Sequence, residues 1–369
     1  MPCRWPWARA TAPSCASPQA STAPGARNPS NSLSLSAGAS WETDLWGRLA
    51  QASSAAQASW QASTSDLAAA RLSAQALLVQ SYFSLRTAEA QAALLERSVA
   101  AYQRALELTQ ARYDAGVAPR SDVLQAQTQL KSAQAQRAET RAQRAQLEHA
   151  IAVLLGAAPS AFGIEPGAAP PRVPAVPPML PATLLERRPD IAAAQRRVAA
   201  AYAQIGVADA AFFPDLMLSA SAGFRHSSLA SLVSAPHLLW SLGPSLTQAL
   251  VDGGQRRLAS AQARASAEQA TASYRQVVLV ALQEVEDNLT LAEQLRQESQ
   301  LQGEALQAAQ RNLEITLEQY RAGTVGYLGV VAAQTSALAS ESAMLALRNR
   351  QLAAVNHLLK NIAGRWDRM

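Results

Sequence analysis

The chain is poor in the residues on which many enzymes and metalloproteins depend. Its 369 residues include 2 Cys and 4 His, and aromatic residues make up 5%. Cys3 and Cys15 have neither a C-x-x-C spacing nor suitable histidine partners, so the sequence offers no metal or redox site. It also shows no nucleophile elbow, catalytic carboxylate pair or phosphate-binding loop. We therefore predict that the chain is not an enzyme and needs no metal or cofactor.

Lysine and long apolar runs are also scarce. Lysine occurs only at Lys131 and Lys360, and the net charge of +5 rests on arginines dispersed among Glu and Gln. Without a basic block or an interleaved aromatic platform, this composition argues against nucleic-acid binding. No run of 18 or more apolar residues predicts a transmembrane helix. Barrel strands, however, give a much weaker signal that such a search misses.

Ala, Gln, Leu, Arg and Glu dominate instead, as is typical of long helices and coiled coils. One turn sequence occurs twice at an offset of 207 positions, which relates Tyr113 to Tyr320 and Gly116 to Gly323. Each Gly ends an Ala- and Gln-rich run, where a residue that tolerates positive φ allows a helix to stop and reverse. The sequence therefore predicts a tandem repeat of a long antiparallel helical hairpin.

The helical runs are longer than a compact domain needs. We expect a first helix of roughly 65 residues, about 100 Å long, that ends near Tyr113, and a return helix over 121–155. A second long helix follows Asp252-Gly253-Gly254, and its return helix ends near Ala363-Gly364. The heptad seam of the first helix consists of Leu78, Leu85, Ala92, Leu95, Val99, Tyr102, Leu106 and Tyr113.

Three stretches, 33–41, 216–224 and 238–247, alternate with period 2 and predict strands with one apolar face and one face of small polar residues. Such strands suit a barrel wall between lipid and a watery lumen. They equally suit a sheet that packs its apolar face on the helices of a soluble protein. Periodicity alone does not decide between these two interpretations. The candidate lipid-facing residues are Leu216, Leu218, Phe224, Leu238, Trp240, Leu242 and Leu246.

The order of these segments predicts a division of the chain. We expect a disordered N-terminus over 1–30, an incomplete first repeat over 31–156 and a second repeat over 182–364, followed by a tail over 365–369. Eight prolines make 157–181 a stiff, extended linker. Pro189 interrupts the helical pattern of 182–211, so we expect a break there and a new helix capped near Asp190.

Several of these segments together resemble the outer-membrane efflux protein family of the TolC/OprM type, and more narrowly its NodT-like lipoproteins of tripartite drug pumps. The similarity covers about 31–364, and it rests on Phe213-Pro214, Asp252-Gly253-Gly254, Glu284-Val285-Glu286, the 185–191 segment Leu-Glu-Arg-Arg-Pro-Asp-Ile and both Tyr-x-Ala-Gly turns. The resemblance implies a TolC-like fold that is mainly α. It also implies a homotrimer whose strands form one outer-membrane barrel in lipid and whose helices form a coiled-coil tunnel through the periplasm.

By the same resemblance, the chain is the outer-membrane channel of a tripartite, RND-type multidrug efflux system. Such a channel is a passive conduit for small molecules, and its partners are a periplasmic adaptor and an inner-membrane transporter. A soluble periplasmic coiled-coil scaffold or adaptor is the alternative. The family places its gate and adaptor-docking tip at the repeated turns. The corresponding residues are Tyr113, Gly116, Arg120, Asp122, Tyr320, Arg321, Gly323, Gly329 and Ala332.

Two departures from the family pattern give further expectations. Relatives often place acidic residues at the entrance, where this chain has Gly329 and Ala332, so we expect a less cation-selective and looser entrance. At the offset of 207, the counterpart of residues 182–235 in the first repeat would span −25 to 28, so most of it would precede Met1. Residues 1–30 do not resemble this block. We therefore expect a truncated or frame-disrupted form with three of the four family strands and with no secretion signal or lipidation cysteine in a proper context.

Overall fold

The computed structural model describes residues 32–167, 171–174, 187–228, 233 and 235–362. The expected disorder of 1–30, the start of the 185–191 segment, the helix end at Ala363-Gly364 and the tail over 365–369 lie outside these residues. The chain forms two compact units, Met1–Trp60 with Arg196–Ala272 and Gln61–Gln195 with Ser273–Met369. Each unit combines corresponding parts of both repeats, so the units in space cut across the repeats in sequence.

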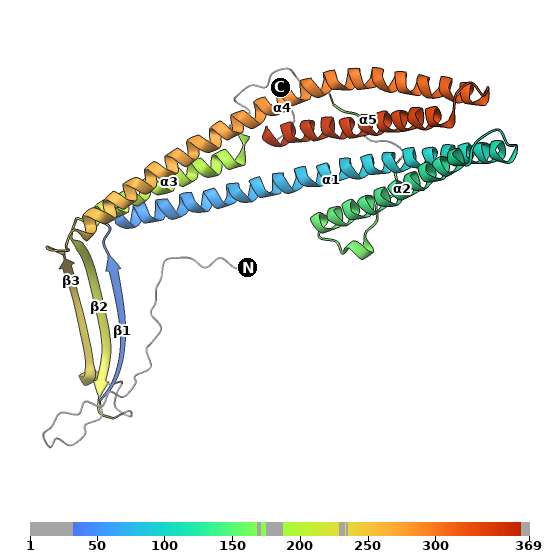
Figure 1. Cartoon of the computed structure of the whole chain (residues 1–369). Coiled ribbons are helices and arrows are strands. Elements are labelled where there is room, and N and C mark those ends of the chain that lie inside the picture. Colours follow the sequence, from blue (N-terminus) through green and yellow to red (C-terminus); the bar gives the residue numbers. More distant parts are fainter. Residues whose placement is uncertain (1–31, 168–170, 175–186, 229–232, 234, 363–369) are drawn as a thin grey trace. The chain divides into compact units, whose positions relative to one another are not determined.

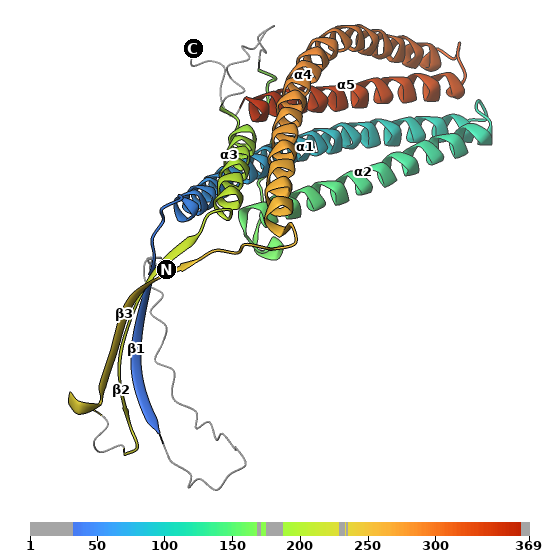
Figure 2. The same ribbon diagram turned by 90° about the vertical axis from the view of Figure 1, so that its left-hand side faces the viewer.

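The four long helices repeat the same spacing, with nearly equal lengths in the two repeats. Helices α1 (Arg48–Asp114) and α4 (Gln255–Arg321) have 67 residues each, and α2 (Arg120–Leu155) and α5 (Tyr327–Asn361) return beside them (Figures 1 and 2). The starts of α1 and α4 differ by 207 (255 − 48), as do those of α2 and α5 (327 − 120). This confirms the tandem repeat of antiparallel hairpins.

The predicted heptad seam of α1 is partly or fully buried from Leu78 to Leu106. Leu85, Leu95 and Tyr102 are buried, and Tyr102 packs with Leu130 of α2 in one core cluster. The prediction was wrong for Tyr113, which is 39% exposed. Tyr113 lies in the last turn of α1, where the chain leads into an exposed reversal and the partner helix no longer covers it.

Among the described helices, α5 is long and apolar enough by composition to cross a membrane, with a mean hydropathy of 1.2 over its best window. A single helix of this kind is weak evidence of a span. Leu347 and Ala354 of α5 pack with Leu295 of α4 in a buried cluster. Pairing within the hairpin therefore covers part of the apolar surface of α5, of whose best window 28% is buried.

The three predicted strands form one antiparallel sheet in the order β1-β2-β3, seen side by side in both views (Figures 1 and 2). Its strands are β1 (Leu33–Glu42), β2 (Asp215–His226) and β3 (Leu238–Thr247). The register places Ala222 beside Trp240 and Ser221 beside Ser241. Because side chains alternate along a strand, the sheet has one apolar face and one face of small polar residues, as predicted.

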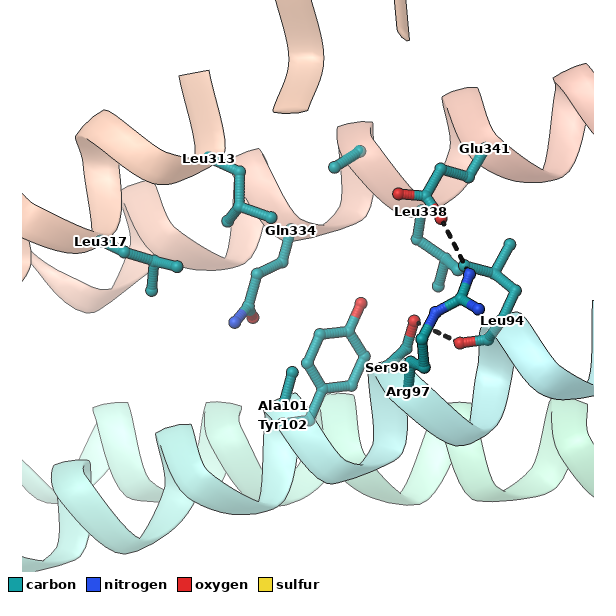
Figure 3. A pocket seen from close by; sticks show the side chains of 11 residues that line it. Leu94, Arg97, Ser98, Ala101, Tyr102, Leu313, Leu317, Gln334, Leu338 and Glu341 are labelled. Atoms are coloured by element: carbon teal, nitrogen blue, oxygen red, sulfur yellow. Dashed lines mark hydrogen bonds and ion pairs between the residues drawn. The ribbon is translucent and has the colours of Figure 1, made fainter. Parts of the chain in front are cut away.

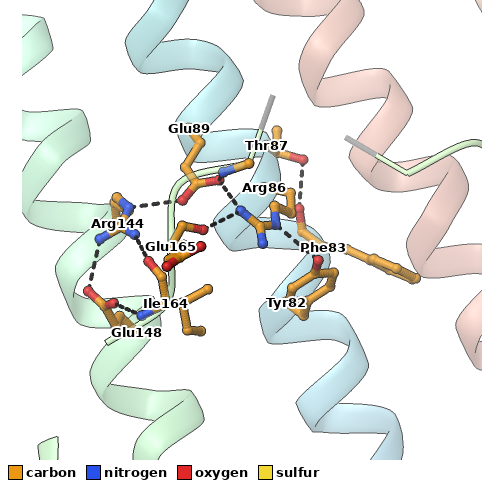
Figure 4. Close-up of polar contacts among 10 residues, drawn as sticks. Tyr82, Phe83, Arg86, Thr87, Glu89, Arg144, Glu148, Ile164 and Glu165 are labelled. Carbon is orange, nitrogen blue, oxygen red and sulfur yellow. Dashed lines mark hydrogen bonds and ion pairs between the residues drawn. The ribbon is translucent and has the colours of Figure 1, made fainter. Parts of the chain in front are cut away.

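Part of the predicted linker is fixed to the helices rather than free-standing. After a short 3-10 helix, η1 (Pro159–Ala161), the Gly167 N–H donates to the carboxylate of Glu89, and Arg144 donates to the Ile164 carbonyl oxygen (Figure 4). Glu89 also accepts hydrogen bonds from Arg86 and Arg144. Burial alone would raise the pKa of Glu89, but hydrogen bonds from Arg86, Gly167 and Arg144 hold it below its ordinary value of 4.5. This charged cluster ties the linker to the first hairpin.

Helix α3 (Pro189–Ala210) starts at the predicted proline break. Arg188, which is 7% exposed, donates to Asp190 at 2.7 Å and to Glu284 of α4 at 2.9 Å. Ile191 packs with Val285 in the same region. The two motif segments around residues 188 and 284 therefore contact each other and join the start of α3 to α4.

Candidate functional site

The two helical reversals have the same backbone geometry. Gly116 and Gly323 have φ of 76° and 78°, in the left-handed region that favours glycine. At the first reversal the N–H of Gly116 bonds to the carbonyl of Tyr113, and that of Val117 bonds to Arg112. The second reversal repeats both bonds 207 residues later. This pattern is a Schellman motif, which satisfies the last carbonyl groups of each helix.

Side chains of the first hairpin hold the second reversal. The Arg112 guanidinium lies 4.7 Å from the centre of the Tyr320 ring and donates a 2.6 Å hydrogen bond to the Tyr320 carbonyl oxygen. The hydroxyl groups of Thr109 and Tyr320 are 3.2 Å apart and share a hydrogen bond. A cation above an aromatic face and a charge-assisted hydrogen bond are both attractive contacts. The ends of α1 and α4 are thus joined by one arginine and one tyrosine.

The two repeats differ in these side chains although their backbones match. Tyr320 is 4% exposed, whereas its repeat counterpart Tyr113 is 39% exposed. Tyr327, at the start of α5, stands where the first repeat has Arg120. Its ring meets that of Tyr320 edge-on at 5.6 Å, and both rings pack with Val330 in a buried cluster. The second reversal is therefore the buried, aromatic one, and the first is the exposed one.

The other predicted tip residues fall into two groups. Arg120 and Arg321 are exposed at helix ends. Asp122 lies half-buried in the first turn of α2, where the helix dipole stabilises a negative charge. At Gly329 a Cβ would come within 2.7 Å of Val325 Cγ1, whereas Ala332 is exposed. The structure therefore has room for an acidic side chain at Ala332 but not at Gly329 without a shift of Val325.

Our prediction of site residues missed Thr109, Arg112 and Tyr327. Two of them, Arg112 and Tyr327, stand where the other repeat has Gln319 and Arg120. A difference between otherwise similar repeats was thus the available signal. Among the described residues, no group of three His, Cys, Asp or Glu side chains could hold a metal ion.

The predicted lipid-facing residues share one face of the sheet. In the register, Leu216 lies opposite Leu246 and Phe224 opposite Leu238, with Leu218, Trp240 and Leu242 at matching positions. Side chains on this face are exposed, with Trp240 at 75% and Leu246 at 68%. On the other face the hydroxyl groups of Ser221 and Ser241 bond at 2.8 Å. The sheet thus exposes a continuous apolar surface opposite a hydroxyl-rich one.

Long helical hairpins combined with a small sheet that exposes an apolar face define a TolC-like fold. The chain belongs to the outer membrane efflux protein family, whose model matches residues 14–157 and 180–364. The match begins at residue 14, earlier than the start near residue 31 that we expected for the similarity. The protein is located in the outer membrane and extends into the periplasm.

Individual relatives support this assignment. OprJ of Pseudomonas aeruginosa is 34% identical over 185 residues, which are 50% of this chain and 38% of OprJ. Nodulation protein T of Rhizobium leguminosarum bv. viciae is 30% identical over 343 residues, 90% of this chain and 69% of that protein. The crystal structure of the open state of the Neisseria gonorrhoeae MtrE outer membrane channel is similar, with a TM-score of 0.82 and 28% identity over 94% of this chain and 78% of MtrE. The chain thus spans little more than a third of OprJ and about two thirds of nodulation protein T.

Proposed function

We propose that this chain is one subunit of a passive conduit through which a tripartite, RND-type efflux system expels small molecules. The observation that carries the proposal is the sheet, because its apolar face is exposed while its opposite face offers hydroxyl groups. A membrane-spanning barrel needs this division, with lipid on one side and water on the other. The membership of the chain in an efflux family supports the same conclusion.

The open edges of the sheet support assembly from several copies. In the described part of the chain, β1 and β3 each pair only with β2, so their outer edges present unpaired backbone groups. Such groups cannot remain unpaired in lipid, where no water satisfies them. Pairing with neighbouring copies in a homotrimer would close the sheet, as the family resemblance implies.

The helical reversals supply a gate in this proposal. Arg112 and Tyr320 join the two hairpins at the ends of α1 and α4, so separating them would widen an entrance formed by these turns. The exposed residues Tyr113, Arg120 and Arg321 remain available to a partner at the same end. A periplasmic adaptor that docks there would link the conduit to an inner-membrane transporter.

The alternative of a soluble scaffold or adaptor is disfavoured by the exposed apolar sheet, because monomeric soluble proteins rarely expose large contiguous apolar surfaces. It predicts that the chain is extracted from cells without detergent. The conduit proposal predicts recovery in the outer-membrane fraction and ion-conducting channels in planar lipid bilayers.

A pair of neighbouring substitutions tests the proposal. Leu242→Arg places a charge on the apolar face and costs about 2–4 kcal/mol in lipid, so we expect loss of the protein from the outer-membrane fraction. Ser241→Arg places the same charge on the hydroxyl-rich face of the same strand and should leave membrane recovery intact. Equal recovery of both variants would contradict a lipid-facing role for the apolar face.

A further inference from the structure

Exposed aromatic side chains gather where the sheet meets the helices. Three connections make up this junction, residues 43–47, 211–214 and 248–254, and they lie at the same end of the sheet within one compact unit. Trp46 and Phe213, in the first two connections, are each 48% exposed. Exposed apolar side chains that gather at one place in a fold mark an interaction surface.

The apolar side chains of the other compact unit include a set whose contacts lie within the chain. Leu94 of α1 and Leu313 and Leu317 of α4 line a groove between helices, at whose edge Arg97 and Glu341 pair at 3.8 Å (Figure 3). Leu94 is buried, and the other two leucines are half-buried. The junction rings differ from this set because about half of their surface is free.

Backbone contacts hold the junction rings in place. The Trp46 ring stacks on that of Phe213, with centroids 4.6 Å apart and planes 16° apart, and its indole N–H donates to the Pro214 carbonyl oxygen at 2.9 Å. The N–H and the hydroxyl of Thr43 both donate to the Leu216 carbonyl oxygen. The polar group of Trp46 is therefore satisfied within the chain, and the exposed part of the stack is hydrocarbon.

Ion pairs lie next to these rings, at the starts of the long helices. Arg48 donates to Glu42 at 2.7 Å. Arg256 lies 5.8 Å from the centre of the Phe212 ring and donates to Asp252 at 2.7 Å. Apolar sheet, aromatic rings and charged helix starts thus follow one another, in the order of acyl chains, boundary and headgroups in a membrane.

The spacing of the aromatic residues matches the height of a membrane. Phe213 and Phe224 are 11 residues apart (224 − 213), about 36 Å of strand. At a tilt of about 40° this length spans about 28 Å, close to the apolar band of about 25 Å that aromatic residues border in outer-membrane barrels. Trp41 pairs with Leu218, 5 residues from Phe213 (218 − 213), and so falls near the middle of the band.

We propose that the stack of Trp46 and Phe213 lies at the boundary between acyl chains and headgroups in the periplasmic leaflet, where it fixes the depth of the sheet. This inference rests on the proposed conduit function, which by itself requires only that the apolar face of the sheet meets lipid. The partner is a phospholipid bilayer rather than a second copy, because the stack continues the apolar band at the spacing a membrane demands. Flat aromatic rings favour this boundary over both the acyl chains and water.

Fluorescence quenching by brominated lipid measures the depth of each ring. The full-length protein is reconstituted in phosphatidylcholine vesicles with bromine either close to the headgroup or near the middle of the acyl chain. Three variants keep one tryptophan each, Trp41, Trp46 or Trp60, with phenylalanine at every other tryptophan position. Trp60 is the matched control, since it is 65% exposed against 64% for Trp41 but lies 12 residues into α1 (60 − 48), about 18 Å along the helix.

The three tryptophans should report three different environments. Trp46 should be quenched more by bromine close to the headgroup, and Trp41 more by bromine near the middle of the chain. This result would place Trp46 about 13 Å shallower than Trp41. Trp60 should be quenched by neither lipid and should remain open to acrylamide in water.

The outcomes separate this inference from the conduit proposal. If lipid quenches Trp41 but not Trp46, or places both at the same depth, the inference is overturned and the conduit proposal stands. Absence of quenching at Trp41 would overturn both. Should a variant with one tryptophan fail to reach the vesicles, Trp46→Phe alone should reduce the quenching of total emission by shallow bromine, whereas Trp60→Phe alone should not, and equal quenching in wild type and Trp46→Phe would overturn the inference.

Discussion

Arg112 of α1 and Tyr320 of α4 are joined by a 2.6 Å hydrogen bond to the tyrosine carbonyl oxygen and by stacking of the guanidinium 4.7 Å from the ring centre. No backbone hydrogen bond between the two reversals appears among those of the described residues. The coupling between the two hairpins at this end therefore depends on side chains, which a mutation can remove without disturbing either helix.

Arg112→Ala should loosen the joint between the hairpins. The lost hydrogen bond and cation–π contact together amount to about 1–2 kcal/mol, which corresponds to roughly a 5- to 30-fold shift toward a separated tip. We expect larger or more frequent openings in single-channel recordings. The matched control is Gln319→Ala, which changes the counterpart of Arg112 in the second repeat and should behave as wild type.

Tyr320→Phe removes only the hydroxyl that bonds to Thr109, so its effect should be smaller, at about 1 kcal/mol. Tyr113→Phe makes the same change at the exposed counterpart and should have no effect. If both phenylalanine variants changed channel opening equally, the asymmetry between the repeats would have no role in gating.

Ala332→Asp should increase the preference of the channel for cations, because Ala332 is exposed near the second reversal and a carboxylate there attracts cations. The measurement is the reversal potential in a salt gradient across a planar bilayer. Ala339→Asp places the same group two turns further along α5, about 10 Å away, and should change the preference less. An unchanged preference in Ala332→Asp would count against an entrance at this position.

Removal of Arg188 should destabilise the junction of α3 with α4. Arg188→Met leaves Asp190 and Glu284 without their shared partner, but both carboxylates are about 40% exposed and regain water. We therefore expect a loss of about 1–3 kcal/mol, less than for a fully buried pair, measured by thermal unfolding followed by circular dichroism. In a double-mutant cycle, Glu284→Gln should cost less in the background of the Arg188→Met variant than in wild type.

The charged cluster around Glu89 should make stability depend on pH in the acid range. Because the pKa of Glu89 in the folded protein is below its ordinary 4.5, its contribution is complete above that value. The contribution is lost as the pH falls from there through the lower folded pKa. Glu89→Gln should cost about 2–4 kcal/mol at pH 7 and should flatten the acid decline in unfolding free energy. An identical pH profile in the variant would exclude Glu89 as a source of that decline.

Gly223→Ala should weaken the pairing of β1 with β2. A Cβ at this position would lie 2.6 Å from the Leu35 carbonyl oxygen and 2.7 Å from Ser36 Cβ, so backbone would have to move. Such crowding costs about 1–3 kcal/mol. Gly243→Ala is the matched control, since a Cβ there meets nothing within 4 Å. The expected result is a lower yield of folded protein in the outer membrane for the first variant only.

The sequence predicted the elements of this fold well because each rests on a local pattern. The offset of 207 residues located both reversals, and the period-2 alternation located all three strands. Local patterns did not predict which distant segments contact each other. Arg188 and Glu284 are 96 residues apart, and nothing in a single sequence indicates that they form an ion pair. They also misjudged Tyr113, because a repeat fixes the backbone while burial depends on what packs against each copy.

The hydroxyl-rich face of the sheet has a consequence for what can pass along it. Its charged side chains, Glu42, Asp215 and Arg225, lie near the strand ends, and the rows between them are serine, glycine and other uncharged residues. A solute moving past this surface would trade hydration water for serine hydroxyls and would meet no fixed countercharge. Anions, cations and neutral compounds would then traverse this stretch with similar ease, and discrimination would have to occur elsewhere along the route.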